Sequence, residues 1–223
     1  MQAKEYSLRE RKHAKTKIAI MNAFIGALEK SRFEDISIRQ ICKNVEISEG
    51  TFFNYFSEKM DIINYYTDLL FLKVIWKARQ EAPQEKFPDF IEAIFSKTAE
   101  ELSNVNFIYK MISVTIVQQE KPKKMVISEI EKKIAFPDCP GIEDIPVVFP
   151  PDFLKTCLEE AYKNGKLPVN TKVDDLSVSL TSIMLGTLLA VKFENLNSKG
   201  YHYLRQLRQL WQGLGIKNAA RRR

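Results

Sequence analysis

The sequence predicts an all-α protein, in which an N-terminal three-helix domain with a helix-turn-helix is followed by a larger helical domain. Three observations carry this prediction. Apolar residues recur at helical spacing through most of the 223 residues. Ser37 and Ser48 stand where two short helices would begin. Five of the nine prolines lie in one segment, residues 136–151, which predicts a long loop there.

The first helices follow from apolar spacing and from capping residues. Ile20 and Phe24 lie one helical turn apart and mark the buried face of a first helix. Ser37 is a good N-cap, and Gln40 completes a capping box, which predicts a second helix. Ser48 can cap a third helix soon afterwards. The second and third helices then meet across a turn of about three residues, as in a helix-turn-helix.

The stretch Ile47–Lys59 places several aromatic rings in a polar neighbourhood. Phe52 and Phe56 stand at i and i+4, so both rings can dock onto the preceding helices. A helix anchored in this way and polar on its other side is suited to the major groove of DNA. The alternative is a short helix packed on both sides within an all-helical core. The residues expected to point outward are Glu49, Gly50, Asn54 and Tyr55.

Longer helices follow, of which the first is expected to end around Pro83. Helical spacing continues from residue 60 to about residue 135. Within it, residues 106–119 contain Val, Thr and Ile, which favour strands, but the helical neighbours favour a helix. The proline-rich segment 136–151 is predicted to be a loop. Pro151 can then lie in the first turn of the next helix, which Gly165 ends.

The two last helices carry more apolar surface than one core contact requires. The penultimate helix has one stripe through Leu180 and a second formed by Val178, Leu185 and Leu189. The last helix repeats apolar residues at alternating intervals of three and four, as paired helices do. We therefore predict a homodimer, with a purely intramolecular core as the alternative. The predicted interface residues are Leu180, Met184, Thr187, Val191, Leu204, Leu207 and Trp211.

The positive charge of the chain is concentrated at its two ends. The net charge is +6, of which residues 1–17 carry +4 and residues 221–223 carry +3, so the remainder is −1. A basic N-terminal segment beside a compact domain is typical of proteins that bind polyanions. A solvated basic tail without a partner is the alternative. Whether Arg221–Arg223 contact DNA does not follow from the sequence.

Several classes of function lack the residues they need. Three cysteines without close pairing do not make a disulfide framework, and two isolated histidines do not make a metal site. The sequence has no nucleotide-binding glycine loop, nucleophile elbow or zinc-protease motif. We therefore expect no enzyme activity, catalytic residues, metal or cofactor. No apolar run approaches the roughly 20 residues of a membrane span, and a cytoplasmic protein without membrane contact is expected.

Two segments resemble the TetR family of bacterial transcriptional regulators. The family pattern runs "T-x-x-x-I-A" and then "G-V-S-x-G-T-L-Y-x-H-F-x-S-K", and Phe33–Lys59 reads "FEDISIRQICKNVEISEGTFFNYFSEK" in register without a gap. Further on, "NGKLPVNTKVDDLSVSLTSIMLG" resembles a weaker family signature. The chain departs at Glu46, where glycine is common, at Phe53, where a tyrosine usually bonds a phosphate, and at Tyr55, where histidine is usual.

The resemblance implies a DNA-binding domain over residues 1–59 and a helical effector-binding and dimerisation domain over residues 60–223. It implies that Arg39 reads guanine and Asn54 reads adenine. Phosphate contacts would come from Thr51, Tyr55 and Lys59. The implied DNA-binding residues are Lys15, Lys17, Arg39, Ser48, Glu49, Gly50, Thr51, Phe53, Asn54, Tyr55 and Lys59.

The resemblance also implies a repressor that binds a palindromic operator as a dimer and is released by a small apolar or aromatic effector. Such release requires that the effector bind one form of the protein more tightly than the other. The alternative is a regulator controlled by a protein partner, or an activator, without a small-molecule inducer. The residues expected to line the effector pocket are Tyr66, Leu70, Phe90, Ile94, Met111, Phe153, Cys157, Met184 and Leu188.

Overall fold

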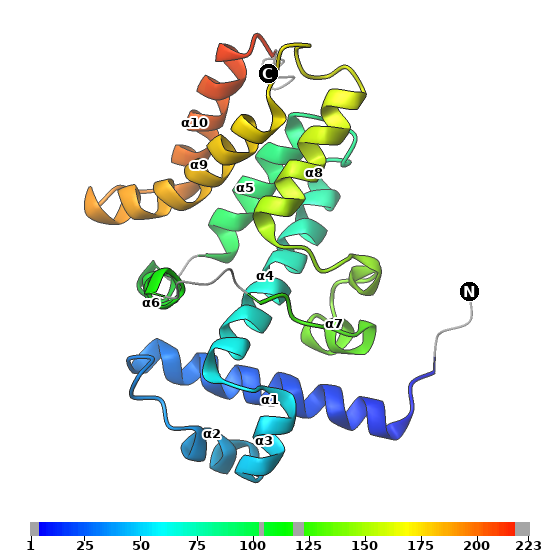
Figure 1. The fold of residues 1–223 in the computed structure, drawn as a ribbon, viewed down its shortest axis with the longest axis vertical. Helices are drawn as coiled ribbons and strands as arrows, with labels where there is room; N and C mark the ends of the chain where they lie inside the picture. The colour runs from blue at the N-terminus through cyan, green and yellow to red at the C-terminus, as the bar shows by residue number, and fades with distance from the viewer. Residues whose placement is uncertain (1–4, 103–104, 118–122, 217–223) are drawn as a thin grey trace. The chain divides into compact units, whose positions relative to one another are not determined.

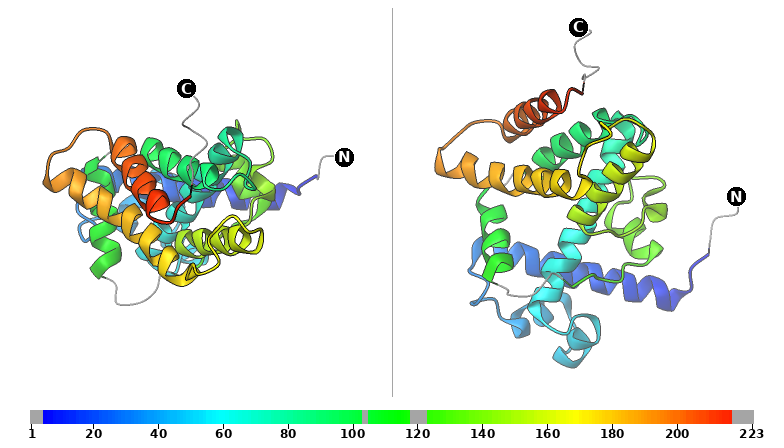
Figure 2. Two further views of the ribbon diagram at one scale, coloured as in Figure 1. Left: turned by 90° about the horizontal axis from the view of Figure 1, so that it is seen from above. Right: turned by 45° about the horizontal axis from the view of Figure 1, so that its top comes forward.

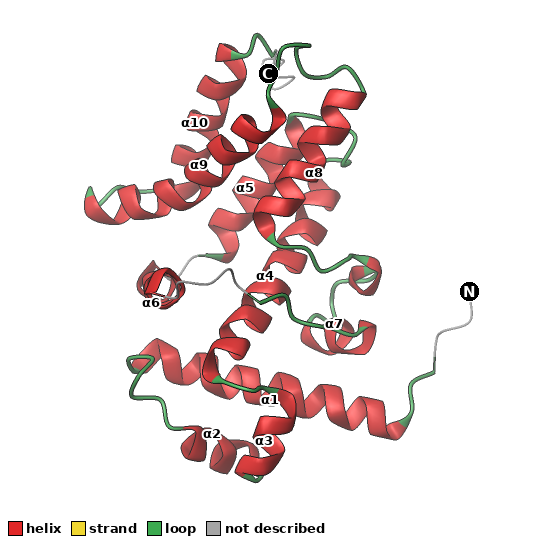
Figure 3. Ribbon diagram, in the orientation of Figure 1, coloured by secondary structure: helices red, strands yellow, loops and turns green. Residues whose placement is uncertain are grey.

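The computed structural model describes residues 5–102, 105–117 and 123–216. These residues form ten α-helices and one 3-10 turn, and no strand occurs among them, which confirms the all-α prediction (Figure 3). They group into two compact units: unit 1 is Met1–Lys73 with Asn104–Val147, and unit 2 is Val74–Ser103 with Val148–Arg223. The elements are α1 (Leu8–Lys30), α2 (Ile38–Val45), α3 (Glu49–Tyr55), α4 (Lys59–Glu81), α5 (Asp89–Glu101), α6 (Val105–Val117), α7 (Glu129–Ala135), η1 (Ile142–Asp144), α8 (Pro150–Lys163), α9 (Val173–Phe193) and α10 (Lys199–Gly213).

In unit 1, helix α1 is the element against which α2, α6 and α7 pack (Figure 1). Helix α1 begins at a capping box in which Ser7 and Glu10 bond each other's backbone N–H groups. At its other end, the Lys110 ammonium on α6 donates to the carbonyl oxygens of Leu28, Glu29 and Ser31 at 2.9, 2.9 and 3.1 Å. A cation at the carbonyl end of a helix is favourable, so Lys110 holds α6 to α1.

The proline-rich segment is a loop over residues 136–149, except for the short turn η1, and its last two residues already belong to α8. Burial lowers the pKa of Lys132 on α7, whose ammonium donates to the backbone oxygens of Glu143 and Ile145 in this loop. Pro150 and Pro151 occupy the first turn of α8, where their missing N–H groups leave no bond unmade. Gly165 has a positive φ of 66° and follows the end of α8, which confirms its predicted capping role.

In unit 2, helix α8 packs against α9, and α10 packs against both α5 and α9 (Figures 1 and 2). Edge-to-face aromatic contacts fill the space between these helices. Phe95 on α5 meets Tyr203 on α10 at a centroid distance of 5.3 Å, and Phe90 on α5 meets Phe153 on α8 at 6.3 Å. The Tyr203 hydroxyl donates to the Met184 carbonyl at 2.7 Å, which ties α10 to α9.

Helix α9 corrects one expectation from the sequence. By length and composition alone it is long and apolar enough to cross a membrane, with a mean hydropathy of 1.7 over its best window. The same property belongs to core helices of soluble proteins, and α9 packs against α8 and α10. Packing within unit 2 uses one side of α9 only, since 33% of this apolar window is buried.

The predicted domain boundary at residues 59 and 60 does not coincide with the compact units. Unit 1 contains α1–α3, the first part of α4 as far as Lys73, and also α6 and α7. The predicted first domain therefore packs with later helices. Residues 1–59 and 60–223 remain a prediction about which parts of the chain bind DNA and effector.

Candidate DNA-binding site

Helices α2 and α3 form the predicted helix-turn-helix, and each begins at its predicted serine. The Ser48 hydroxyl oxygen accepts from the Thr51 N–H at 3.1 Å, and the Ser37 oxygen accepts from the Gln40 N–H at 3.4 Å. The predicted capping box at Ser37 is incomplete, because the Gln40 amide instead donates to Asn44 at 2.9 Å. A single cap is thus sufficient to start α2.

The turn between α2 and α3 requires a left-handed residue, and that residue is Glu46. Its φ and ψ are 58° and 45°, and its N–H bonds the carbonyl oxygens that end α2. A glycine would adopt this conformation without strain, whereas a side chain makes it less favourable. The Glu46 carboxylate is exposed, as a charged group at this position has to be.

Two phenylalanines hold α3 from behind, as predicted. Phe52 and Phe56 are 0% and 1% exposed, and their ring centroids lie 6.4 Å apart. Phe56 also meets Tyr65 of α4 edge to face at 5.5 Å. Burial of two phenyl rings stabilises this contact by about 3–6 kcal/mol. The two rings therefore fix the rotation of α3 about its axis. The helical period then determines which residues face the opposite side.

The exposed side of α3 consists of Glu49, Gly50, Phe53 and Asn54, which we call the α3 outer face. The spacing i, i+1, i+4, i+5 places all four on one side of a helix. A methyl group at Gly50 would lie 3.9 Å from the Ser48 hydroxyl, so packing within the protein does not require glycine there. Its missing side chain leaves room for close approach of another surface.

Two further predicted residues lie at the margin of this face and are half-buried. The Thr51 hydroxyl is 2.8 Å from the Ser48 hydroxyl, so it is engaged in the cap. The ring of Tyr55 lies against His13 of α1, with centroids 4.6 Å apart. The exposed His13 is thereby placed beside α3. The sequence holds no local signal for His13, because this contact joins two distant segments.

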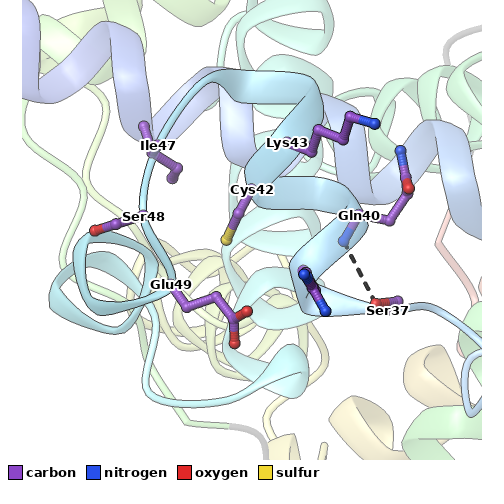
Figure 4. A pocket seen from close by; sticks show the side chains of 8 residues that line it. Ser37, Gln40, Cys42, Lys43, Ile47, Ser48 and Glu49 are labelled. Carbon is purple, nitrogen blue, oxygen red and sulfur yellow. Dashed lines mark hydrogen bonds between the residues drawn. The ribbon is translucent and has the colours of Figure 1, made fainter.

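A basic face of α2 adjoins the start of α3. Arg39 and the exposed Lys43 stand at i and i+4 and line an open hollow of about 610 Å³ between the two helices (Figure 4). Lys43 was not predicted, although its spacing from Arg39 was a usable signal. Burial, with the Glu49 carboxylate nearby, raises the pKa of the Cys42 thiol in this hollow. Cys42 is thus kept as a neutral thiol.

The lysines predicted to bind DNA differ in their accessibility. Lys15 is exposed on α1, as the prediction requires. The Lys59 ammonium already donates to the backbone oxygens of Phe33 and Glu34 at 3.1 and 3.2 Å, so only part of its hydrogen-bonding capacity is left for DNA. Lys17 is a wrong prediction. It is 8% exposed and is paired with Glu131 of α7 at 3.1 Å, so its charge is used inside unit 1.

The residues predicted to line an effector pocket are divided between the two units. Tyr66, Leu70 and Met111 belong to unit 1. The remaining six belong to unit 2, and all six are buried there. A hollow of about 420 Å³ in unit 2, between the start of α9 and the end of α10, is lined by other residues. The effector-pocket set therefore stays a prediction. The six are Phe90, Ile94, Phe153, Cys157, Met184 and Leu188.

Of the seven residues predicted for the dimer interface, six are buried in the core of unit 2, and the interface itself stays a prediction. Gln206 of α10 donates to the Thr187 hydroxyl at 2.7 Å, so this stripe of α9 faces α10. Leu204 is half-buried. The second stripe is the more accessible one, since Val178 and Leu185 are exposed. The six buried residues are Leu180, Met184, Thr187, Val191, Leu207 and Trp211.

By sequence, no family model and no curated relative matches the chain. Its fold, however, matches solved structures. FadR of Thermus thermophilus, a TetR-family transcriptional repressor in complex with lauroyl-CoA, aligns with a TM-score of 0.62 at 18% identity, over 91% of this chain and 97% of that one. The reduced form of E. coli NemR aligns with a TM-score of 0.57 at 14% identity, over 87% and 96%. A putative TetR-family regulator from Shewanella sp. PV-4 gives 0.54 at 11%, over 89% and 97%.

These alignments extend over most of both chains, so they include the helices of unit 1 and of unit 2. The order of elements also agrees with the resemblance seen in the sequence, in which a capped helix-turn-helix precedes a larger helical region. The chain therefore has the fold of the TetR family of transcriptional regulators.

Proposed function

We propose that the protein is a DNA-binding transcriptional regulator that binds a palindromic operator as a homodimer and is released from it by a small apolar effector. The α3 outer face carries this proposal. Its exposed Glu49, Gly50 and Asn54 lie on a short helix that Phe52 and Phe56 anchor from behind. A helix that is anchored in this way and free on its outer side fits the major groove of DNA.

Several groups on and beside this face have a role that matches their chemistry. Asn54 can pair with the N6 and N7 atoms of adenine, and Arg39 can pair with O6 and N7 of guanine. Tyr55 and His13 lie beside this face, and Lys15 lies on α1 in the basic N-terminal segment. All three side chains suit phosphate contacts. These contacts set the register on DNA, whereas the α3 outer face reads bases.

Selection of bound DNA from a random pool tests the proposal. We expect an inverted repeat whose half-sites are centred about 34–36 Å apart. Asn54→Ala and Arg39→Ala should each weaken binding by about tenfold or more and relax preference at one position. Lys15→Ala should weaken all sequences alike and lower the salt dependence. If the selection returns only unordered sequences that the variants bind as tightly as the wild-type protein does, α3 does not read DNA.

For the dimer we propose the second apolar stripe of α9, which we call the α9 outer face. Its exposed large residues are Val178, Leu185 and Phe193. Gly186 and Ala190 on the same side are exposed and small, and no atom lies within 4 Å of a methyl group built at Gly186. Exposed apolar residues with small residues beside them permit close helix contact, and an exposed apolar patch indicates an interface.

Leu185→Glu tests this interface. The change should raise the dimer dissociation constant on the order of 100-fold, because a carboxylate would be buried beside its symmetry mate. Analytical ultracentrifugation at micromolar concentration measures the change, and DNA affinity should fall with it. Val169→Glu places the same charge on an apolar residue that is 90% exposed and serves as the control. A Leu185→Glu protein that stays dimeric would rule out the α9 outer face.

An apolar or acyl compound is the effector class we propose. The TetR-fold repressor FadR of Thermus thermophilus was solved with lauroyl-CoA, and the core of unit 2 here is rich in aromatic and aliphatic side chains. Adding cell extract to the DNA selection separates the possibilities. A small-molecule fraction that releases the palindrome supports this effector class, whereas release by a protein fraction alone supports control by a partner protein.

A further inference from the structure

Phe53 is the one large apolar side chain that is exposed between residues 31 and 59, all of which the structure describes. It is 49% exposed and lies on the α3 outer face among Glu49, Gly50 and Asn54. An exposed phenyl ring in a polar setting is unfavourable in water, and burial against a partner removes that cost. The ring also lacks a hydroxyl, so it cannot donate a hydrogen bond to a phosphate.

Packing restricts the direction of this ring. The Phe53 ring meets the ring of Phe52 edge to face, with centroids 5.3 Å apart and an interplanar angle of 83°. Phe52 is fully buried, so it forms a rigid support on one side of Phe53. Of the two outer-face residues one turn earlier, Glu49 and Gly50, the glycine has no side chain to cover the ring, and the ring remains 49% exposed. The remaining side of the ring is therefore held outward and is open to a partner.

The bases of DNA offer one apolar group in the major groove, the C5-methyl of thymine. Phenylalanine is among the side chains that contact it. Building on the proposed DNA-binding function, we infer that Phe53 contacts the C5-methyl group of one thymine in each operator half-site. Phe53 is then a residue that determines sequence specificity, in place of a phosphate contact at this position.

The neighbouring residue narrows the expected sequence. Asn54 exposes an amide next to Phe53 on α3, and an amide in the major groove pairs best with adenine. Adjacent residues of a helix project about 100° apart, so Phe53 and Asn54 meet different groups of the DNA. Since one favours the thymine methyl group and the other favours adenine, both select A·T pairs in each half-site.

Uracil substitution isolates the methyl group. In the operator recovered by selection, each thymine is replaced in turn by deoxyuridine, which removes only the methyl and keeps the hydrogen-bonding groups. We expect one position per half-site at which wild-type affinity falls about fourfold, and about 15-fold when both half-sites are substituted. The Phe53→Ala protein should bind the thymine operator more weakly and should not distinguish thymine from uracil at that position.

Two controls separate this inference from its alternatives. Val169→Ala removes another exposed apolar side chain, in unit 2, and should keep the wild-type preference for thymine. Thermal unfolding should show that Phe53→Ala still folds cooperatively with only a small loss of stability, because the ring is 49% exposed. One outcome is that a palindrome is bound, but every thymine-to-uracil change lowers the affinity of the wild-type protein and of Phe53→Ala equally. The inference is then wrong, and DNA binding stands. If no palindrome is bound, the proposed function itself fails.

Discussion

Lys17→Met should lower the free energy of unfolding by about 3–5 kcal/mol, because it leaves a carboxylate buried without its partner. The Lys17 and Glu131 side chains are only 10% and 3% exposed, and their charged atoms lie 3.1 Å apart. The Lys17 ammonium also donates to the Val126 carbonyl at 3.0 Å and lies 4.4 Å from the centre of the Tyr65 ring. Removal of the lysine breaks all three interactions together.

Urea unfolding followed by circular dichroism measures this effect in a double-mutant cycle. Glu131→Gln alone should also destabilise, because it leaves the ammonium buried. The double variant Lys17→Met/Glu131→Gln has no buried charge and should lose less than the sum of the single changes, with a coupling energy of about 1–3 kcal/mol. The Ser128 N–H, which donates to Glu131 at 2.7 Å, keeps an acceptor in the glutamine variant.

Lys15→Met is the matched control, since Lys15 is an exposed lysine on the same helix. Its effect on unfolding should remain within about 0.5 kcal/mol, as for most surface changes. Equal stability of Lys15→Met and Lys17→Met would show that the buried pair contributes nothing net. This prediction concerns the fold of unit 1 alone and does not depend on DNA binding.

Asp68→Asn should stabilise the protein at neutral pH and not at pH 4. Burial raises the pKa of Asp68 from an ordinary value of 3.8 to about 6, although the Met125 N–H and Lys124 act in the opposite direction. Between pH 3.8 and about pH 6, the Asp68 carboxyl group is mostly protonated in the folded chain and mostly ionised in the unfolded chain. Stability from this group is therefore present below about pH 4 and is lost as pH rises through about 6.

A shift of about two pKa units corresponds to about 3 kcal/mol. Asparagine is neutral at every pH, and its side-chain oxygen can still accept from the Met125 N–H, which lies 3.2 Å from the Asp68 carboxylate. The difference in unfolding free energy between Asp68→Asn and wild type should thus grow from near zero at pH 4 to about 2–3 kcal/mol at pH 7.5. Urea titrations at several pH values measure it.

Asp138→Asn removes an exposed carboxylate of unit 1 and controls for the loss of charge. Its stability relative to wild type should change little over the same pH range. A difference for Asp68→Asn that is independent of pH would mean that the carboxylate is not desolvated. A destabilised variant at pH 7.5 would mean that the charged form is needed by its neighbours.

Local features could be predicted from the sequence because their causes are local. Ser48 caps α3 by bonding the Thr51 N–H within the same turn. Phe52 and Phe56 are buried because the helical period places both rings on one side. Glu49, Gly50 and Asn54 of the α3 outer face follow from the same period, whereas Tyr55, also expected to point outward, is half-buried against His13. Phe53 was assigned to the site, but its exposure could be known only once the supporting ring of Phe52 was in place.

The burial of Lys17 and the exposure of Lys15 could not be predicted from the sequence. Both belong to one basic segment and look alike in sequence, yet one is buried and the other is exposed. The difference arises from Glu131 and Val126, which lie more than a hundred residues away and are brought to α1 by α7 and the segment before it. A charge run does not indicate which of its members will meet such a partner.

Periodicity by itself determined that α9 is apolar on two sides, through Leu180 on one and Leu185 on the other. Only the tertiary structure decided which side is buried: Leu180 is 0% exposed and Leu185 is 51% exposed. The physical reason is that hydrophobic burial has no direction of its own, so either stripe can be covered. The hydrogen bonds of Tyr203 and Gln206 from α10 to Met184 and Thr187 fix the choice.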